Sequence, residues 1–141
     1  MIERSDLEHF TTILEFAAGI ADRGIPLSLV LVEPEGAADP DVLERFATHV
    51  STRIRRSDRF AKLTQVRFAA LLVDCNRQGA MIFADRLQSI RKVDDIDLTL
   101  ACGIAWWSEP MKEYGDLVSA AEAALQRART AGGGAIELHR P

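Results

Sequence analysis

The sequence predicts an α+β fold in which one five-stranded sheet carries helices packed against it. Apolar residues recur with helical and with strand-like spacing in the order helix, strand, helix, strand, strand, helix, strand, helix, strand. The run Leu27–Val32 is almost continuously apolar, as a central strand must be when both of its faces are covered. The 141 residues, 48% hydrophobic and 27% charged, suit one core of substantial size. We therefore expect residues 1–141 to form a single domain.

The first half of the chain predicts two helices around that apolar strand. Residues 7–21 repeat their apolar positions at helical spacing, and the segment 22–26 stops the pattern. After the strand and a short loop, Asp39 is placed to cap a second helix with Pro40 at its first position. The apolar face of this second helix continues to residue 54.

The second half predicts a hairpin, two helices and two further strands. Their apolar periods and turn residues give strands at 59–63, 67–73, 98–107 and 135–139, and helices at 78–91 and 114–130. The hairpin turns at residues 64–66, and the glycines at 132–134 end the last helix. The acidic stretch 94–97 is interpreted as a solvated connection rather than a metal site.

Composition argues against several classes of function. The net charge of -4 and the pI near 5.4 disfavour a general nucleic-acid binder, although 14 arginines against 3 lysines leave room for local phosphate contacts. The first residues lack the basic-then-apolar order of a signal peptide, and no apolar run approaches the roughly 18 residues of a membrane span. We therefore expect a cytoplasmic protein without a membrane span.

Cysteines and histidines give no sign of a metal site or cofactor. Cys75 and Cys102 stand in apolar surroundings, which favours two buried free thiols over a disulfide or a metal clip. His9, His49 and His139 are scattered without metal-ligand spacing, so surface or packing roles are expected for them.

The run Arg55–Phe68 resembles the catalytic hairpin of GGDEF-domain diguanylate cyclases, in which R-x-x-D is followed after five residues by G-G-D-E-F. Three other segments are similar to elements of that family in the same order, namely Pro26–Val32, Leu98–Ala105 and Ala121–Gly132. The resemblance implies a nucleotide-cyclase-like fold with a mostly antiparallel five-stranded central sheet. It also implies a connection to the bacterial second messenger cyclic di-GMP.

The resemblance further implies that catalysis is lost, because the signature positions carry Thr64, Gln65, Val66 and Arg67. In the family, the glycines let the backbone approach a phosphate, and carboxylates hold a divalent metal that neutralises the phosphate charge during cyclisation. Of the matching metal-binding positions only Glu33 is acidic, and the family's guanine-recognition stretch is missing after it. We therefore expect no enzyme activity, no catalytic residues and no bound metal.

The inhibitory site of the family is the part that the sequence retains. In the family, the R-x-x-D arginine binds phosphate and guanine of a stacked cyclic di-GMP pair, and the aspartate accepts from a guanine edge. Arg55 and Asp58 match that register, and Arg86 matches the family's second arginine on the next helix. At the end of the last predicted helix, Arg129 could still contact a phosphate.

A bare R-x-x-D pattern is weak evidence, because chance alone gives about one in a chain of this composition. Arg91–Asp94 indeed supplies another. The register with the hairpin and with Arg86 supports a ligand site. The alternative interpretation is that Arg55, Asp58 and the neighbouring cations form a solvated helix end, where positive charge interacts favourably with the helix dipole.

These observations predict a non-catalytic cyclic di-GMP receptor that binds its ligand through Arg55, Asp58 and Arg86. Because the ligand is commonly a two-fold stacked pair in this family, it could bridge protomers into a homodimer or larger oligomer. The other hypothesis is a pseudo-enzyme that binds no nucleotide and serves as an interaction or dimerisation module for an unidentified signalling protein.

Overall fold

The structure, a computed structural model, describes residues 4–36, 39–90 and 98–140. The elements within these ranges are α1 (Arg4–Ala21), β1 (Leu27–Pro34), α2 (Pro40–Ser51), β2 (Arg59–Lys62), β3 (Phe68–Val73), α3 (Arg77–Ile90), β4 (Leu100–Trp106), α4 (Tyr114–Ala131) and β5 (Ile136–Leu138). Their order is the predicted one. Both hairpin strands are shorter than predicted, because Leu63 and Arg67 belong to the turn and are joined by a 2.7 Å backbone hydrogen bond. The acidic stretch 94–97 lies outside the described residues.

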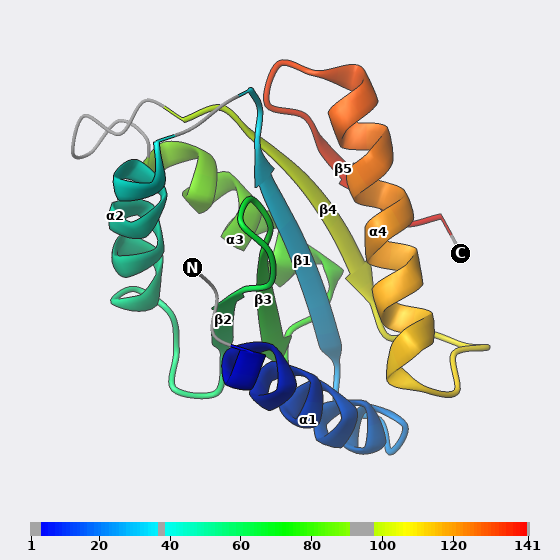
Figure 1. The fold of residues 1–141 in the computed structure, drawn as a ribbon. Coiled ribbons are helices and arrows are strands. Elements are labelled where there is room, and N and C mark those ends of the chain that lie inside the picture. Colours follow the sequence, from blue (N-terminus) through cyan, green and yellow to red (C-terminus); the bar gives the residue numbers. More distant parts are fainter. Residues whose placement is uncertain (1–3, 37–38, 91–97, 141) are drawn as a thin grey trace.

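The strands form one sheet in the order β2-β3-β1-β4-β5 (Figure 1). Neighbouring strands are antiparallel except β4 and β5, which are parallel. The predicted α+β fold with a mostly antiparallel five-stranded sheet is therefore confirmed. Val32 of β1 faces Phe68 on one side and Cys102 on the other. Glu33, the next residue of β1, consequently lies beside the hairpin turn that precedes Phe68.

Strand β1 is buried on both faces, as its continuous apolar run predicts. Val30 and Val32 belong to the core beneath α2 and α3, whereas Leu29 and Leu31 belong to the core beneath α1 and α4 (Figure 1). Each fully buried side chain of this kind contributes roughly 1.5–3 kcal/mol to folding. Within the described ranges, none of the helices has the length and apolar character needed to cross a lipid bilayer.

The helix ends follow the predicted chemistry. Asp39 Oδ1 accepts a hydrogen bond from Asp41 N–H at 2.8 Å, and Pro40 occupies the first turn of α2. At the end of α4, Gly132 has a φ of 69° and donates its N–H to Ala128 O at 3.0 Å. That φ lies in the left-handed region, which glycine adopts without steric cost.

Both cysteines are free thiols, but their surroundings differ. Cys102 is buried within β4, and burial raises the pKa of its thiol to about 12. Cys75 lies between β3 and α3 and is only half-buried. The prediction of two buried thiols is therefore right for Cys102 and wrong for Cys75, which follows the end of β3 instead of belonging to a strand.

Gly103 allows α4 to lie directly on β4. A Cβ atom at this position would stand 2.6 Å from Leu125 Cα and 2.7 Å from Ala121 O, and closer still to Leu125 N. These are backbone atoms of α4, so the contact cannot be relieved by a side-chain rotation.

Replacing Gly103 by alanine should therefore push α4 away from the sheet. We expect Gly103→Ala to lower the free energy of unfolding by about 3 kcal/mol, measured by urea denaturation. Gly19→Ala is the matched control, because a Cβ there meets nothing within 4 Å on helix α1. The control should stabilise by about 0.5–1 kcal/mol, since alanine loses less backbone entropy than glycine in a helix. Equal effects at the two glycines would contradict the close approach of α4.

Candidate functional site

The end of β1 and the hairpin turn bring together residues that the sequence analysis assigned to the family's metal positions. Glu33 stands near the end of β1, and Arg67 is the last residue before β3. Thr64 Oγ1 accepts from Val66 N–H at 3.2 Å and from Arg67 N–H at 3.0 Å. Thr64 thus satisfies two backbone donors of the turn, and the Arg67 side chain extends to other elements.

Two arginines hold the Glu33 carboxylate. Arg67 Nε bonds Glu33 Oε1 at 3.2 Å, and Arg129 Nε of α4 lies 3.3 Å from Glu33 Oε2. Arg67 Nη1 also bonds Glu122 Oε2 at 3.2 Å. The side chain of Glu33 is 9% exposed, whereas those of Arg129 and Glu122 are about half exposed. This arginine–glutamate network joins β1, the hairpin turn and α4.

The network does not fit a divalent metal. Each oxygen of the buried Glu33 carboxylate lies beside a guanidinium, and both guanidinium groups would repel a cation placed there. Across the described part of the chain, no group of three or more His, Cys, Asp or Glu is placed to hold a metal ion. The guanidinium of Arg67 supplies the positive charge that a carboxylate at this place requires.

The glycine loop after α4 is also engaged by a carboxylate. Gly133 N–H donates to Glu35 Oε2 and Gly134 N–H donates to Glu35 Oε1, each at 3.2 Å. Gly133 and Gly134 have φ values of 69° and 76°, which turn their amides toward the same acceptor. Backbone donors of this kind suit a phosphate, but here they tie the β1–α2 connection to the end of α4.

Arg55 and Asp58 are brought together, and they bond each other. Arg55 Nε donates to Asp58 Oδ2 at 3.2 Å, and Arg55 Nη2 donates to Asp58 Oδ1 at 3.0 Å and to Val73 O at 2.9 Å. The side chain of Asp58 is 5% exposed and that of Arg55 is 54% exposed. The hydrogen bonds that Arg55 donates to Asp58 raise the pKa of the Arg55 guanidinium, and they outweigh the lowering by burial. The pair fixes an exposed arginine at the end of β3.

Arg86 lies in a pocket of about 420 Å³ between α2 and α3. Its lining includes Arg53 and Ile54, the residues just before Arg55 in the chain, together with apolar side chains of α2 and α3. Arg55 and Asp58 are not among the lining residues. The structure therefore unites the first two predicted site residues and sets Arg86 in a separate basic pocket that also contains Arg53, which the sequence analysis did not single out.

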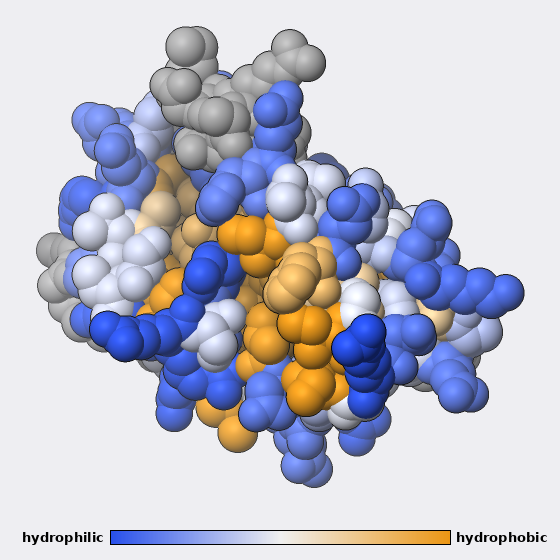
Figure 2. All heavy atoms as spheres, turned by 90° about the horizontal axis from the view of Figure 1, so that it is seen from below, coloured by the Kyte–Doolittle hydropathy of each residue, from blue (hydrophilic) through white to orange (hydrophobic). Residues whose placement is uncertain are grey.

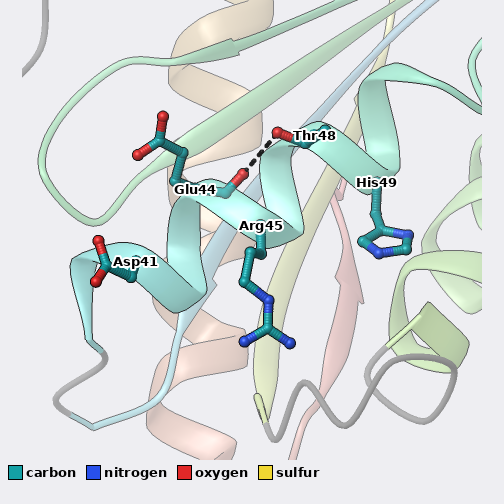
Figure 3. Close-up of a pocket in the computed structure, with 5 residues that line it drawn as sticks. All are labelled: Asp41, Glu44, Arg45, Thr48 and His49. Atoms are coloured by element: carbon teal, nitrogen blue, oxygen red, sulfur yellow. Dashed lines mark hydrogen bonds between the residues drawn. The ribbon is translucent and has the colours of Figure 1, made fainter.

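A further hollow of about 350 Å³ runs along the outer side of α2. It is lined by Asp41, Glu44, Arg45, Thr48 and His49, all from one helix (Figure 3). Thr48 Oγ1 bonds back to Glu44 O at 3.0 Å, and the carboxylates point away from the Arg45 guanidinium. Side chains of one helix that diverge in this way do not converge on a ligand.

The chain belongs to the GGDEF family. The family profile described as diguanylate cyclase, GGDEF domain, matches residues 37–135. A relative from Sinorhizobium fredii, the uncharacterized protein y4lL, is 31% identical over 117 residues, which cover 75% of this chain. The chain spans 14% of that relative's length.

Solved GGDEF domains share the fold at low sequence identity. The GGDEF domain of YfiN (TpbB) from Pseudomonas aeruginosa has a TM-score of 0.81 at 22% identity, with 95% of each chain covered. The active GGEEF domain of a diguanylate cyclase from Vibrio cholerae has a TM-score of 0.85 at 15% identity, covering 95% of this chain and 96% of that one. The GGDEF domain of DgcB from Caulobacter crescentus, solved in complex with c-di-GMP, has a TM-score of 0.79 at 16% identity, covering 93% and 88%.

The arginine–glutamate network predicts unequal roles for its two arginines. Arg67→Ala removes the more buried arginine and leaves the Glu33 carboxylate with one partly exposed partner, so we expect a loss of about 1–3 kcal/mol of unfolding free energy. Arg129→Ala removes a half-exposed pair and should cost about 0–1 kcal/mol. Urea denaturation of both variants measures this difference.

The double variant Glu33→Gln with Arg67→Ala tests the cause. It should recover part of the loss, because no buried carboxylate is then left short of a partner. Losses that simply add would show that Arg67 acts through packing alone.

Proposed function

We propose that this chain is a non-catalytic GGDEF domain that binds cyclic di-GMP through Arg55, Asp58 and Arg86. The proposal that the domain is not catalytic rests on the pairing of the Glu33 carboxylate with two guanidinium groups. The observation that supports the ligand site is the exposed Arg55 guanidinium, oriented by Asp58 and by Val73 O.

Cyclisation of nucleotide triphosphates needs divalent metal to neutralise the phosphate charge as the 3′-hydroxyl attacks. A metal at this place would have to displace Arg67 and Arg129 from Glu33 and then lie beside their positive charges. Thr64 and Gln65 also carry side chains where the family's glycines let the backbone reach a phosphate. Charge and shape therefore both oppose catalysis.

Arg55 has the geometry that a phosphate or guanine edge would use. Its guanidinium is oriented before any ligand arrives, which reduces the entropy lost on binding. Asp58 Oδ1 accepts one bond from Arg55 and has a second lone pair, so a guanine donor would bond Asp58 while Arg55 stays oriented. Such a charge-assisted bond would add to those that Arg55 makes to the ligand. We choose cyclic di-GMP as the ligand because a solved protein of the same fold, DgcB, was crystallised in complex with it.

The separation of Arg86 from Arg55 favours a ligand-bridged assembly. Arg86 lines its own pocket with Arg53, so a stacked ligand pair held by Arg55 of one protomer would meet Arg86 of a second protomer. Binding would then be coupled to formation of a homodimer.

A second candidate function is a protein interaction module that binds no nucleotide. In this case the closed Arg55–Asp58 pair would serve only to fasten the segment after α2. An exposed apolar surface favours this candidate: Phe16 of α1 is 72% exposed and Ile25, in the turn after α1, is 41% exposed. Figure 2 shows apolar residues gathered in the middle of the face seen from below, the end of the molecule that α1 crosses in Figure 1. The partner of such an interaction module would be a signalling protein.

Titration calorimetry with cyclic di-GMP separates the two functions. We expect heat of binding with the natural sequence, and about tenfold or greater weakening in Arg55→Ala, Asp58→Asn and Arg86→Ala, because each loses charge-assisted bonds to the ligand. Arg45→Ala removes the same charge from the outer side of α2 and should leave the affinity unchanged. No heat from a folded protein, or full affinity in Arg55→Ala, would reject the receptor and favour the interaction module.

Incubation with GTP and Mg²⁺ tests the loss of catalysis. We expect no cyclic di-GMP by chromatography, because the Arg67 guanidinium stands where a metal ligand is required. Arg67→Glu should introduce binding of Mn²⁺ detectable by calorimetry, whereas Arg67→Gln, which removes the charge without adding a carboxylate, should bind it more weakly. Product from the natural sequence would contradict the proposed consequence of the network.

A further inference from the structure

A basic pocket of about 470 Å³ lies where β4 and β5 end, beside the start of α3. Its lining includes Arg77, Trp106, Leu138, His139 and Arg140. None of these residues belongs to the Glu33 network, to the Arg55–Asp58 pair or to the Arg86 pocket. The volume falls within the roughly 300–1,000 Å³ of small-molecule sites.

Trp106 organises one wall of this pocket. The Cζ atom of Arg77 stands over the Trp106 ring at 5.7 Å from its centroid, a cation–π distance. The His139 ring meets the same indole edge-on, with centroids 4.0 Å apart and planes at 83°. The backbone N–H of His139 also donates to Ile104 O at 2.7 Å, which fixes the chain just after β5. The guanidinium and the imidazole are thus held by the same ring.

Positive charge in the pocket exceeds negative charge. Arg77 and Arg140 are exposed, and neither is paired with a carboxylate of the described residues. Glu137 is the acidic residue of the lining, and its Oε1 lies 3.7 Å from Arg127 Nε. Among the described residues, therefore, neither Arg77 nor Arg140 of the pocket has a carboxylate partner, and the pocket's own carboxylate, Glu137, lies beside Arg127.

His139 adds a buried polar group without a partner. It is 6% exposed, and its Nε2 atom makes no hydrogen bond. Most buried polar atoms in proteins are hydrogen-bonded, so such an atom beside a basic pocket is unusual. Burial and the nearby Arg127 lower the pKa of His139, so the ring is neutral at pH 7 and retains one N–H donor.

We propose that this pocket binds a phosphate monoester carried by a flat or apolar organic group. The exposed guanidinium forks of Arg77 and Arg140 suit the phosphate oxygens, and His139 holds the Trp106 ring in place behind them. Ile136, Leu138 and the accessible part of the Trp106 ring supply an apolar surface for the organic group.

Adenosine 5′-monophosphate is the first probe, followed by tryptophan fluorescence and titration calorimetry at pH 7. We expect saturable binding to the natural sequence, and about tenfold or greater weakening in Arg77→Ala and in Arg140→Ala. Both arginines are exposed, so these variants should retain the thermal unfolding temperature of the natural protein. Arg45→Ala is the charge-matched control and should bind normally.

Three more titrations distinguish this pocket from the Arg55 site and from simple attraction of an anion. Arg55→Ala should bind the probe normally. If this variant lost binding, the probe would be binding at the Arg55 site, and the proposal would be overturned. Inorganic phosphate should bind more weakly than the probe, and adenosine should bind more weakly still. Equal affinity for phosphate and the monoester would overturn the role of Trp106, and absence of saturable probe binding would overturn the site itself.

Discussion

The burial of β1 on both faces is the constraint on which the rest of the structure depends. Because β1 lies between β3 and β4, its pairing register decides which residue of each neighbour stands beside its end. A slip of one residue would exchange the side chains of the two cores, so leucines would enter the space of valines and the packing would fail on both faces. The same register sets Glu33 beside Arg67, and the chemistry at that end of the sheet follows from the packing of its middle.

At that end, protein groups satisfy charges that ligands would otherwise satisfy. The Glu33 carboxylate pairs with Arg67 and Arg129, and the amides of the glycine loop donate to Glu35. Each contact joins the end of β1 or the residues just after it to a distant part of the chain. At the opposite end of the sheet, where β3 and β4 finish, Arg55 and Arg77 are exposed.

The element order, the two-faced burial of β1 and the caps at Asp39 and Gly132 could be predicted from local periodicity and turn chemistry. The closeness of Arg55 to Asp58 also followed from three-residue spacing, but their direct bonding did not, since spacing alone does not say whether two side chains face each other or a ligand. The sequence allows Arg129 to contact a phosphate, but in the structure it bonds Glu33. Arg129 stands seven residues after Glu122, so helical periodicity puts the two on one face of α4. This spacing could have indicated that both residues belong to the same charged network.

The central place of β1 also has a consequence for how the chain folds. β1 precedes its partner strands in the chain, which end at Val73 and Trp106, and the amides that bond Glu35 come about a hundred residues after it. The centre of the sheet therefore closes only through contacts between distant segments, and such topologies fold more slowly than those built from local contacts. During translation this apolar strand emerges before both of its neighbours, and an apolar strand without its partners is prone to association with other chains.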